Sequence, residues 1–404
     1  MKITGIVAEY NPFHTGHGYQ IAQTRARFDE KIGVVAVMSG NWVQQADSAV
    51  ADKWTRARLA LLGGADLVLE LPTVWATASA ERFARGAVSL LHHTGVVDHL
   101  SFGSEDGEIE PLKKAADALD SPEFQAGLSR HLEQGMSFPA ARQRAVEQLL
   151  GEGASPLSSP NNNLGIEYLR SLNALGSTIT PLTILRKGAA HNAISTDAPE
   201  FVSATHIRTC LKAERREDIF PYLVQGDQSP LFQENMQFSS LKLAERAILA
   251  RIRAMRAEDW ARLPDSSQAE GLPQRLEKAG GQCTSVEHFL TLVKTKRYTH
   301  ARLRRLVLWA YLGLTADLIP ETPSYLRVLG FNRTGQEILK AMKQSASLPL
   351  ITKPAHAREL PQPGRALFEL ESTMNACCIS LTNGIWKIPF AARMILRVRP
   401  SKLW

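Results

Sequence analysis

The N-terminal stretch KITGIVAEYNPFHTGHGYQIAQTRARF, residues 2–28, joins a strand pattern to a helix pattern. Residues 2–8 (KITGIVA) are mostly apolar and rich in β-branched side chains, which predicts a buried strand. Residues 18–28 (GYQIAQTRARF) place their apolar side chains on one face of a helix. A strand, a glycine-bearing loop and a helix form the setting in which backbone N–H groups and the helix dipole bind a phosphate.

The loop between the two patterns, EYNPFHTGH, holds His14 and His17 around Gly16. Composition alone would produce His-x-Gly-His about 0.02 times in this chain, so the pattern indicates a site. The alternative is a loop whose histidines only cap a helix or pack against it. We predict that both imidazoles contact the phosphates of a nucleotide. We also expect a tight loop fixed by Pro12, with Asn11 turned toward phosphate.

The composition is that of a soluble globular protein. The 404 residues are 44% apolar and 22% charged, and the formal net charge of +7 fits either a polyanionic partner or an ordinary basic enzyme. No run approaches the roughly 20 apolar residues of a membrane helix, and the start has no signal-peptide pattern. The four cysteines show neither metal-ligand spacing nor a disulfide framework, which favours a reducing, cytoplasmic setting: Cys210, Cys283, Cys377 and Cys378.

Strand and helix patterns alternate through the first two hundred residues. Further strands are predicted at residues 32–38, 66–71, 99–102 and 178–185. Helices are predicted at residues 52–62, 80–91, 108–150 and 163–175. This alternation predicts an α/β fold class with a Rossmann-like, doubly wound parallel sheet.

The second part of the chain differs, because strand patterns thin out beyond about residue 225. Helices are predicted there at residues 241–255, 286–293, 300–311 and 335–342, and a flexible loop at residues 265–274. We therefore predict two domains. Residues 1–228 would form the catalytic domain, and residues 229–404 a mainly α-helical, basic one.

Polar and glycine residues gather at the carboxyl ends of the predicted strands. They are Ser39-Gly40-Asn41, Gly103-Ser104-Glu105, Arg186-Lys187-Gly188 and, at the start of the next helix, residues 203–208 with Ser203 as N-cap. Ligands of an open parallel sheet bind at these ends, near the switch in strand order. We predict a single nucleotide pocket in which Arg186, Lys187 and Arg208 neutralise phosphates beside the two histidines.

Several reaction types are excluded by missing motifs. The chain has no Gly-x-x-x-x-Gly-Lys-Ser/Thr loop, no serine nucleophile elbow and no zinc spacing. The chemistry that remains is attack on an α-phosphate with pyrophosphate leaving. Positioning and electrostatic stabilisation supply most of the catalysis in such a reaction.

Two short motifs and six longer strings resemble known families. The segments His14-Thr15-Gly16-His17 and Ser203-Ala204-Thr205-His206-Ile207-Arg208 are similar to two signatures of the HIGH-type nucleotidyltransferase superfamily. A narrower resemblance, to the bacterial tRNA(Met) cytidine acetate ligase family, spans residues 1 to about 340. The strings that carry it are EYNPFHTGH (9–17), MSGNWVQ (38–44), DKWTRA (52–57), FGSE (102–105), PNNNLGIEYL (160–169) and YTHARLRRL (298–306).

This resemblance implies a nucleotidyltransferase-like core and a ligase reaction. ATP would activate acetate as acetyl-adenylate, with His14 and His17 as catalytic residues at the α-phosphate and Mg²⁺ accompanying the pyrophosphate. The acetyl group would then pass to the wobble cytidine of elongator tRNA(Met), giving N4-acetylcytidine. The implied ATP-site residues are Val7, Ala8, Glu9, Tyr10, Asn11, Pro12, Phe13, His14, Thr15, Gly16, His17, Gly18, Tyr19, Gln20, Gly103, Asn161, Asn162, Arg186 and Lys187, to which the helix start adds Ser203, Thr205 and Arg208.

The chain departs from the family pattern in two places. After MSGNWVQ the family usually continues Arg-Gly-Glu-Pro, whereas this chain has Gln45-Ala46-Asp47-Ser48. The tail at residues 386–404 (WKIPFAARMILRVRPSKLW) is basic and unlike the usual ending of the family.

A basic stretch in the second part favours RNA as the polyanionic partner. It has no acidic residue and could neutralise phosphates, while its tyrosine could stack on an unpaired anticodon base. A solvated helix face is the alternative reading. The predicted RNA-binding residues are Lys294, Lys296, Arg297, Tyr298, Arg302, Arg304 and Arg305.

Two other functions remain open from the sequence. A small-molecule adenylyltransferase of cofactor biosynthesis would share the pocket but would need neither the basic helical part nor tRNA. A catalytically impaired tRNA-binding protein would account for the altered residues 45–48.

Overall fold

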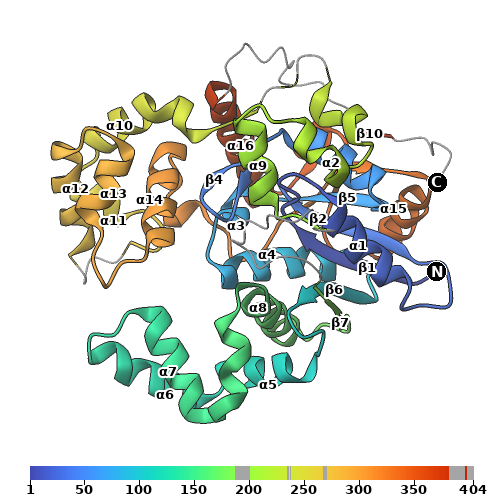
Figure 1. Cartoon of the computed structure of the whole chain (residues 1–404), viewed down its shortest axis with the longest axis horizontal. Coiled ribbons are helices and arrows are strands. Elements are labelled where there is room, and N and C mark those ends of the chain that lie inside the picture. The colour runs from blue at the N-terminus through green and yellow to red at the C-terminus, as the bar shows by residue number, and fades with distance from the viewer. Residues whose placement is uncertain (187–200, 234–235, 237, 267–270, 382–395, 398–404) are drawn as a thin grey trace.

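The computed structural model describes residues 1–186, 201–233, 236, 238–266, 271–381 and 396–397 (Figure 1). Within this part the core is a sheet in the order β10-β8-β5-β2-β1-β6-β7, with β9 paired to β8. The strands are β1 (Ile3–Ala8), β2 (Gly33–Ser39), β5 (Leu67–Leu71), β6 (His99–Ser104), β7 (Thr180–Leu185), β8 (Leu326–Phe331), β9 (Leu350–Ile351) and β10 (Leu396–Arg397). A small hairpin, β3 (Trp42–Val43) and β4 (Asp47–Ser48), stands apart from it.

The predicted doubly wound parallel sheet is confirmed. Strands β5, β2, β1, β6 and β7 are neighbours in this order, and each adjacent pair is parallel. From β1 the chain proceeds outward through β2 and β5, then returns to β6 on the other side of β1. The switch in strand order therefore lies between β1 and β6, at whose carboxyl ends a ligand site is expected.

Helices cover both faces of the sheet because side chains of a strand alternate between them (Figure 1). Ile6 of β1 packs in one core with α1 (Thr15–Arg25), α2 (Lys53–Leu62) and α9 (Ala204–Lys212). Ile3 packs in the other core, with α4 (Ala80–His93) and α8 (Pro160–Ala174). The short α3 (Thr73–Ala76) precedes α4.

Two groups of helices project from this body (Figure 1). The single helix predicted for residues 108–150 is three helices: α5 (Glu110–Leu119), α6 (Pro122–Glu133) and α7 (Phe138–Leu150). Ser121 accepts a hydrogen bond from the Phe124 N–H and Pro122 occupies the first turn, so a new helix starts where the periodicity appeared continuous.

The second group comes from the second half of the chain. Its helices are α10 (Glu245–Ala254), α11 (Ala257–Ala261), α12 (Leu272–Gln282), α13 (Val286–Val293) and α14 (His300–Leu312). The loop predicted at residues 265–274 is too long, because α12 begins at Leu272 after Gly271 in the left-handed conformation. Trp309 of α14 donates a hydrogen bond of 3.0 Å to the Thr77 hydroxyl, which joins the group to the core.

The second half also extends the sheet, which the sequence patterns did not indicate. β8 runs antiparallel to β5 and is followed by α15 (Arg333–Ser345). Helix α16 (Gln362–Cys377) then packs on the core. The division after residue 228 stays a prediction. In the described part of the chain, no helix has the length and apolar character needed to cross a bilayer.

Replacing Gly86 of α4 with Ala tests the packing of this helix on α3. A Cβ at Gly86 would lie 2.4 Å from Cγ of the buried Trp75. We expect the free energy of unfolding in urea to fall by about 1–3 kcal/mol, despite the better helix propensity of Ala. The matched control is Gly281→Ala in α12, where a Cβ meets nothing within 4 Å. Equal stability of the two variants would contradict this packing.

Candidate active site

A cavity of about 310 Å³ opens at the switch point, beyond the carboxyl ends of β1, β6 and β7. Its wall is formed by the loop after β1, the start of α1, the hairpin β3–β4 and helices α4, α8 and α9. The predicted site residues that line it are Val7, Ala8, Glu9, Tyr10, Asn11, His14, Gly16, His17, Tyr19, Gln20, Gly103, Asn161, Arg186, Ser203, Thr205 and Arg208. Pro12, Phe13, Thr15, Gly18 and Asn162 are not part of this wall, and Lys187 lies outside the described residues.

The two histidines form the start of α1. The helix begins at Thr15, three residues earlier than predicted, and His14 is its N-cap. Nδ1 of His14 accepts a hydrogen bond from the Gly16 N–H at 3.1 Å, and Nδ1 of His17 accepts one from the His14 N–H at 3.2 Å. The two rings lie 3.9 Å apart between centroids. The two histidines therefore cap the helix, and the same two side chains line the cavity in which a phosphate is predicted.

Both imidazoles are neutral in this site. Burial lowers the pKa of His14 to about 4, and Arg186 and Arg208 add to the effect. Burial also lowers the pKa of His17 well below its usual value, with contributions from His14 and Arg186. Since each Nδ1 accepts a backbone N–H, the proton of each ring is on Nε2. The two histidines can thus donate two hydrogen bonds to an anion. Being neutral, they cannot balance the negative charge of phosphates, and only Arg186 and Arg208 of the described wall can do so.

The prefix Glu9 to Phe13 is explained by its contacts. The rings of Tyr10 and Phe13 lie 4.9 Å and 5.4 Å from that of His17, which they hold in place. Asn11 lines the cavity, and its Oδ1 accepts a hydrogen bond of 2.7 Å from the Val50 N–H, so a contact of this side chain with phosphate stays a prediction. The peptide bond between Asn11 and Pro12 is cis.

Arg56 of α2 joins the loops that follow β1 and β2. It is fully buried, and its five N–H groups donate to the carbonyls of Glu9, Ser39, Gly40 and Ala51. Arg56 belongs to the string DKWTRA, but no sequence pattern indicates that it is buried. Its burial fixes the backbone at the carboxyl ends of the two central strands.

Two cations lie on the cavity wall. Gly103 at the end of β6 allows Arg186 to pass close by, since a Cβ there would be 3.0 Å from Arg186 Cγ. Arg208 of α9 donates to the Asn11 carbonyl at 2.8 Å and to the Thr205 hydroxyl at 2.9 Å. The predicted N-cap of α9 is confirmed, because Ser203 accepts a hydrogen bond from the His206 N–H.

The two asparagines at the start of α8 have different positions. Asn161 lines the cavity and donates to Glu105 Oε1 at 2.7 Å. Asn162 is buried, and its Oδ1 accepts a hydrogen bond of 3.0 Å from the Glu105 N–H. Asn162 therefore fixes the backbone just after β6 but does not itself line the cavity.

Eleven residues of the wall were not predicted. Most are apolar and lie in buried helices and strands, where they look like ordinary core residues. They are Gln44, Gln45, Phe83, Phe102, Leu164, Tyr168, Ile184, Leu185, Phe201, Val202 and Ala204. Four of them (Gln44, Phe102, Leu164 and Tyr168) belong to the family-like strings, which was the available signal.

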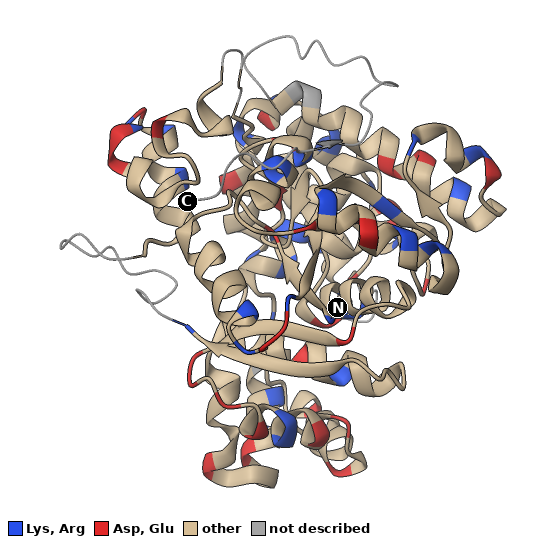
Figure 2. Ribbon diagram, turned by 90° about the vertical axis from the view of Figure 1, so that its right-hand side faces the viewer, with Lys and Arg blue, Asp and Glu red and all other residues tan. Residues whose placement is uncertain are grey.

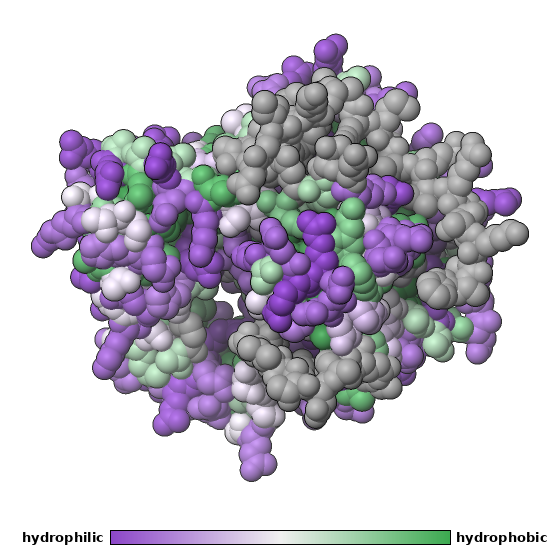
Figure 3. All heavy atoms as spheres, turned by 45° about the horizontal axis from the view of Figure 1, so that its top comes forward, coloured by the Kyte–Doolittle hydropathy of each residue, from purple (hydrophilic) through white to green (hydrophobic). Residues whose placement is uncertain are grey.

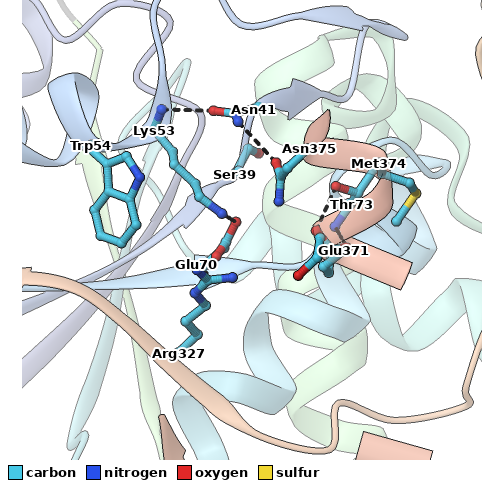
Figure 4. A network of polar contacts seen from close by, with 12 residues as sticks. Ser39, Asn41, Lys53, Trp54, Glu70, Thr73, Arg327, Glu371, Met374 and Asn375 are labelled. Carbon is cyan, nitrogen blue, oxygen red and sulfur yellow. Dashed lines mark hydrogen bonds and ion pairs between the residues drawn. The ribbon is translucent and has the colours of Figure 1, made fainter. Parts of the chain in front are cut away.

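The hairpin that carries Gln44 and Gln45 is fixed by α16, 330 residues later in the chain (Figure 4). Asn41 Nδ2 donates to Asn375 Oδ1 at 3.0 Å, and the Trp42 indole donates to the Met374 carbonyl at 3.1 Å. Glu371 anchors the helix by accepting a hydrogen bond from the Thr73 hydroxyl at 2.9 Å.

Buried ion pairs centred on Glu70 lie beside these contacts (Figure 4). Lys53 Nζ lies 2.5 Å from Glu70 Oε1, and Arg327 Nε lies 3.2 Å from Glu70 Oε2 (Figure 4). The opposite charges lower the pKa of Glu70 although its burial acts in the other direction. Burial and the charge of Glu70 raise the pKa of Glu371 to about 7.

The predicted RNA-binding stretch lies before and in α14. Lys296, Arg297 and Arg304 are exposed. Arg305 forms an ion pair with Asp265 at 3.0 Å, and Arg302 donates to the Asp265 carbonyl. Tyr298 is buried with Arg302 over its ring, so the prediction that it stacks on a base does not agree with this structure.

Basic and acidic residues are interspersed along the described part of the ribbon (Figure 2). The surface seen in Figure 3 is mostly hydrophilic and is hollowed between the projecting helices and the body of the molecule.

Replacing His14 with Asn tests whether the buried histidine is neutral. Asn is a good N-cap, so α1 keeps its start. The unfolded chain protonates His14 near pH 6.5 and the folded chain only near pH 4, so the free energy of unfolding falls as pH drops between these values. We expect the variant to lose part of this fall, on the order of 3 kcal/mol, in urea unfolding at pH 7.5 and 4.5. The same pH dependence of the free energy of unfolding in the variant and the wild type would contradict a neutral His14.

Comparison with known proteins supports the family resemblance. A family model described as HIGH Nucleotidyl Transferase matches residues 1–385. The tRNA(Met) cytidine acetate ligase of Caldanaerobacter subterraneus subsp. tengcongensis is 37% identical over 387 residues, which are 91% of this chain and 92% of the relative. That of Clostridium kluyveri is 40% identical over 382 residues, covering 89% and 92%.

Solved structures agree with the sequence comparison. The apo crystal structure of Thermotoga maritima TmcAL has a TM-score of 0.92 and 32% identity, covering 99% of this chain and 100% of that one. A second form, bound with alpha-thio ATP, has a TM-score of 0.90 at the same identity and coverage. The chain therefore belongs to the HIGH nucleotidyl transferase family and, within it, to the tRNA(Met) cytidine acetate ligases.

Proposed function

We propose that this protein uses ATP to activate acetate and then acetylates the wobble cytidine of elongator tRNA(Met). The observation that carries the proposal is the cavity wall, where two neutral histidines with Nε2–H groups lie beside Arg186 and Arg208. Such a wall suits a polyphosphate. The names of the relatives indicate a cytidine of tRNA(Met) as the acceptor and acetate as the acid that is activated.

The activation step needs stabilisation of negative charge at the α-phosphate. An acetate oxygen attacks the α-phosphorus, the bond to the β-phosphate oxygen breaks, and pyrophosphate leaves with the electron pair. In our proposal the Nε2–H groups of His14 and His17 donate to the phosphate oxygens while charge builds on them. Because both rings are already held by backbone N–H groups, little reorganisation is needed during the reaction.

Mg²⁺ is expected to enter with ATP. In the described part of the chain no three His, Cys, Asp or Glu side chains gather as a metal site. Carboxylates are scarce among the described residues of the cavity wall, which fits an ion held mainly by phosphate oxygens and water, as Mg²⁺ commonly is. When bound, the ion would screen the charge of the leaving pyrophosphate.

The acceptor would come to the cavity from the tRNA anticodon loop. An unpaired wobble base can leave its stack at small cost and enter a pocket. The exposed basic residues Lys296, Arg297 and Arg304 are our candidates for phosphate contacts. We place the reaction in the cytoplasm, where tRNA and ATP meet.

Replacing His14 or His17 with Ala tests the activation step. We expect acetate-dependent exchange of pyrophosphate into ATP to fall at least about 100-fold, because each variant loses one donor to the developing charge. The matched control is His300→Ala, an exposed histidine away from the cavity wall, which should keep full exchange. Full exchange in both site variants would refute the assignment.

The same preparation identifies the acceptor. Wild-type protein with radiolabelled acetate, ATP and bulk tRNA should place label in tRNA. Transfer of AMP to a small molecule would instead support an adenylyltransferase, and tRNA binding without turnover an impaired enzyme.

Reversing the charge of Lys296, Arg297 and Arg304 to Glu tests the tRNA contact. We expect KM for tRNA to rise at least tenfold at 0.15 M salt while the ATP–pyrophosphate exchange stays unchanged, because phosphate contacts add to binding and not to activation. The control is the same charge change at three exposed residues of α15: Arg333, Lys340 and Lys343. Equal KM in the two triple variants would contradict the contact.

A further inference from the structure

Glu9 is the only carboxylate among the described residues that line the cavity. It follows directly after β1, at the switch point of the sheet. We propose that Glu9 accepts the proton released when the cytidine amine takes up the acetyl group. This inference rests on the proposed function and assigns the second half of the reaction to a named side chain.

Both the backbone and the carboxylate of Glu9 are held by hydrogen bonds. Its backbone carbonyl accepts a hydrogen bond of 2.7 Å from the buried Arg56. Its Oε1 accepts one of 2.6 Å from the Gln44 N–H, and the hairpin that carries Gln44 is held by α16. The carboxylate is therefore oriented before any substrate binds, as a catalytic group requires.

Glu9 shares the cavity wall with Tyr168 of α8 and Arg208 of α9. Burial raises the pKa of Tyr168, and the charge of Glu9 adds to this effect. The same charge counteracts the effect of burial on the pKa of Arg208. The Glu9 carboxylate is therefore close enough to act electrostatically on one aromatic and one cationic side chain of the wall. Aromatic side chains offer a surface on which a base can stack, and we place the amine of the cytidine beside the Glu9 carboxylate.

The other polar groups of the wall cannot take this proton. His14 and His17 use Nδ1 to accept backbone N–H groups, so Nε2 of each ring already carries hydrogen. Arginine stays protonated. Burial raises the pKa of Tyr10 and Tyr168, so both phenols stay neutral and are poor acceptors. Among the described residues of the wall, the Glu9 carboxylate is therefore the group that can accept the proton.

The exocyclic nitrogen attacks the acetyl carbon of acetyl-adenylate and a C–N bond forms. The bond from that carbon to the phosphate oxygen breaks, and AMP leaves with the electron pair. The nitrogen, whose lone pair is shared with the ring, must lose a proton for the amide to form. The Glu9 carboxylate receives it and later releases it to solvent.

The test is Glu9→Gln in the full-length protein. The amide oxygen of Gln can still accept the Gln44 N–H, so the variant removes the basic oxygen and keeps the anchor. Preformed acetyl-adenylate is mixed with the variant and tRNA in a single turnover. We expect acetyl transfer to fall at least about 100-fold, while acetate-dependent ATP–pyrophosphate exchange falls by no more than about tenfold. Exposed Glu123→Gln is the control and should match wild type in both.

Three results would overturn the assignment. Transfer at the wild-type rate in Glu9→Gln would show that no carboxylate is needed. Loss of exchange together with a raised Mg²⁺ requirement would make Glu9 a metal ligand instead. Loss of both half-reactions with weakened ATP binding by calorimetry would make it a binding residue. Failure of wild-type protein to exchange pyrophosphate or to label tRNA would instead refute the proposed function, and the Glu9 role with it.

Discussion

The site depends on the buried guanidinium of Arg56 and its hydrogen bonds to four backbone carbonyls. Removing such a charge from water costs several kcal/mol unless every donor is satisfied, and here all five N–H groups have carbonyl partners. Burial lowers the pKa of Arg56 to about 10, which still leaves it charged at neutral pH. One side chain thereby sets the separation of the two loops that carry Glu9 and the β3–β4 hairpin.

The histidines illustrate how capping and ligand binding can share one geometry. A helix start leaves N–H groups without partners, and His14 satisfies one of them through Nδ1. The same bond fixes the tautomer and leaves Nε2–H as a donor for an anion. Electrostatic work in the cavity is thus divided: arginines supply charge, histidines supply oriented donors, and Glu9 supplies a basic oxygen.

The central sheet could be predicted because its parallel strands are short, continuous apolar runs. The start of α1 was placed three residues late because a histidine N-cap looks like loop. Arg56 could not be found, since an arginine in an amphipathic helix reads as exposed and only tertiary carbonyls bury it. Phe83 and Tyr168 look like core residues of their helices, and β8 pairs with a strand about 260 residues away, which no local pattern encodes.

The contact between Asn41 and Asn375 also has a consequence for synthesis. These residues are 334 positions apart, so the hairpin beside the cavity lacks its support until nearly the whole chain has left the ribosome. At about 5–20 residues per second this takes roughly 20 to 80 s. The strands that carry the two histidines and the hairpin therefore leave the ribosome well before the helix that supports the hairpin beside the cavity.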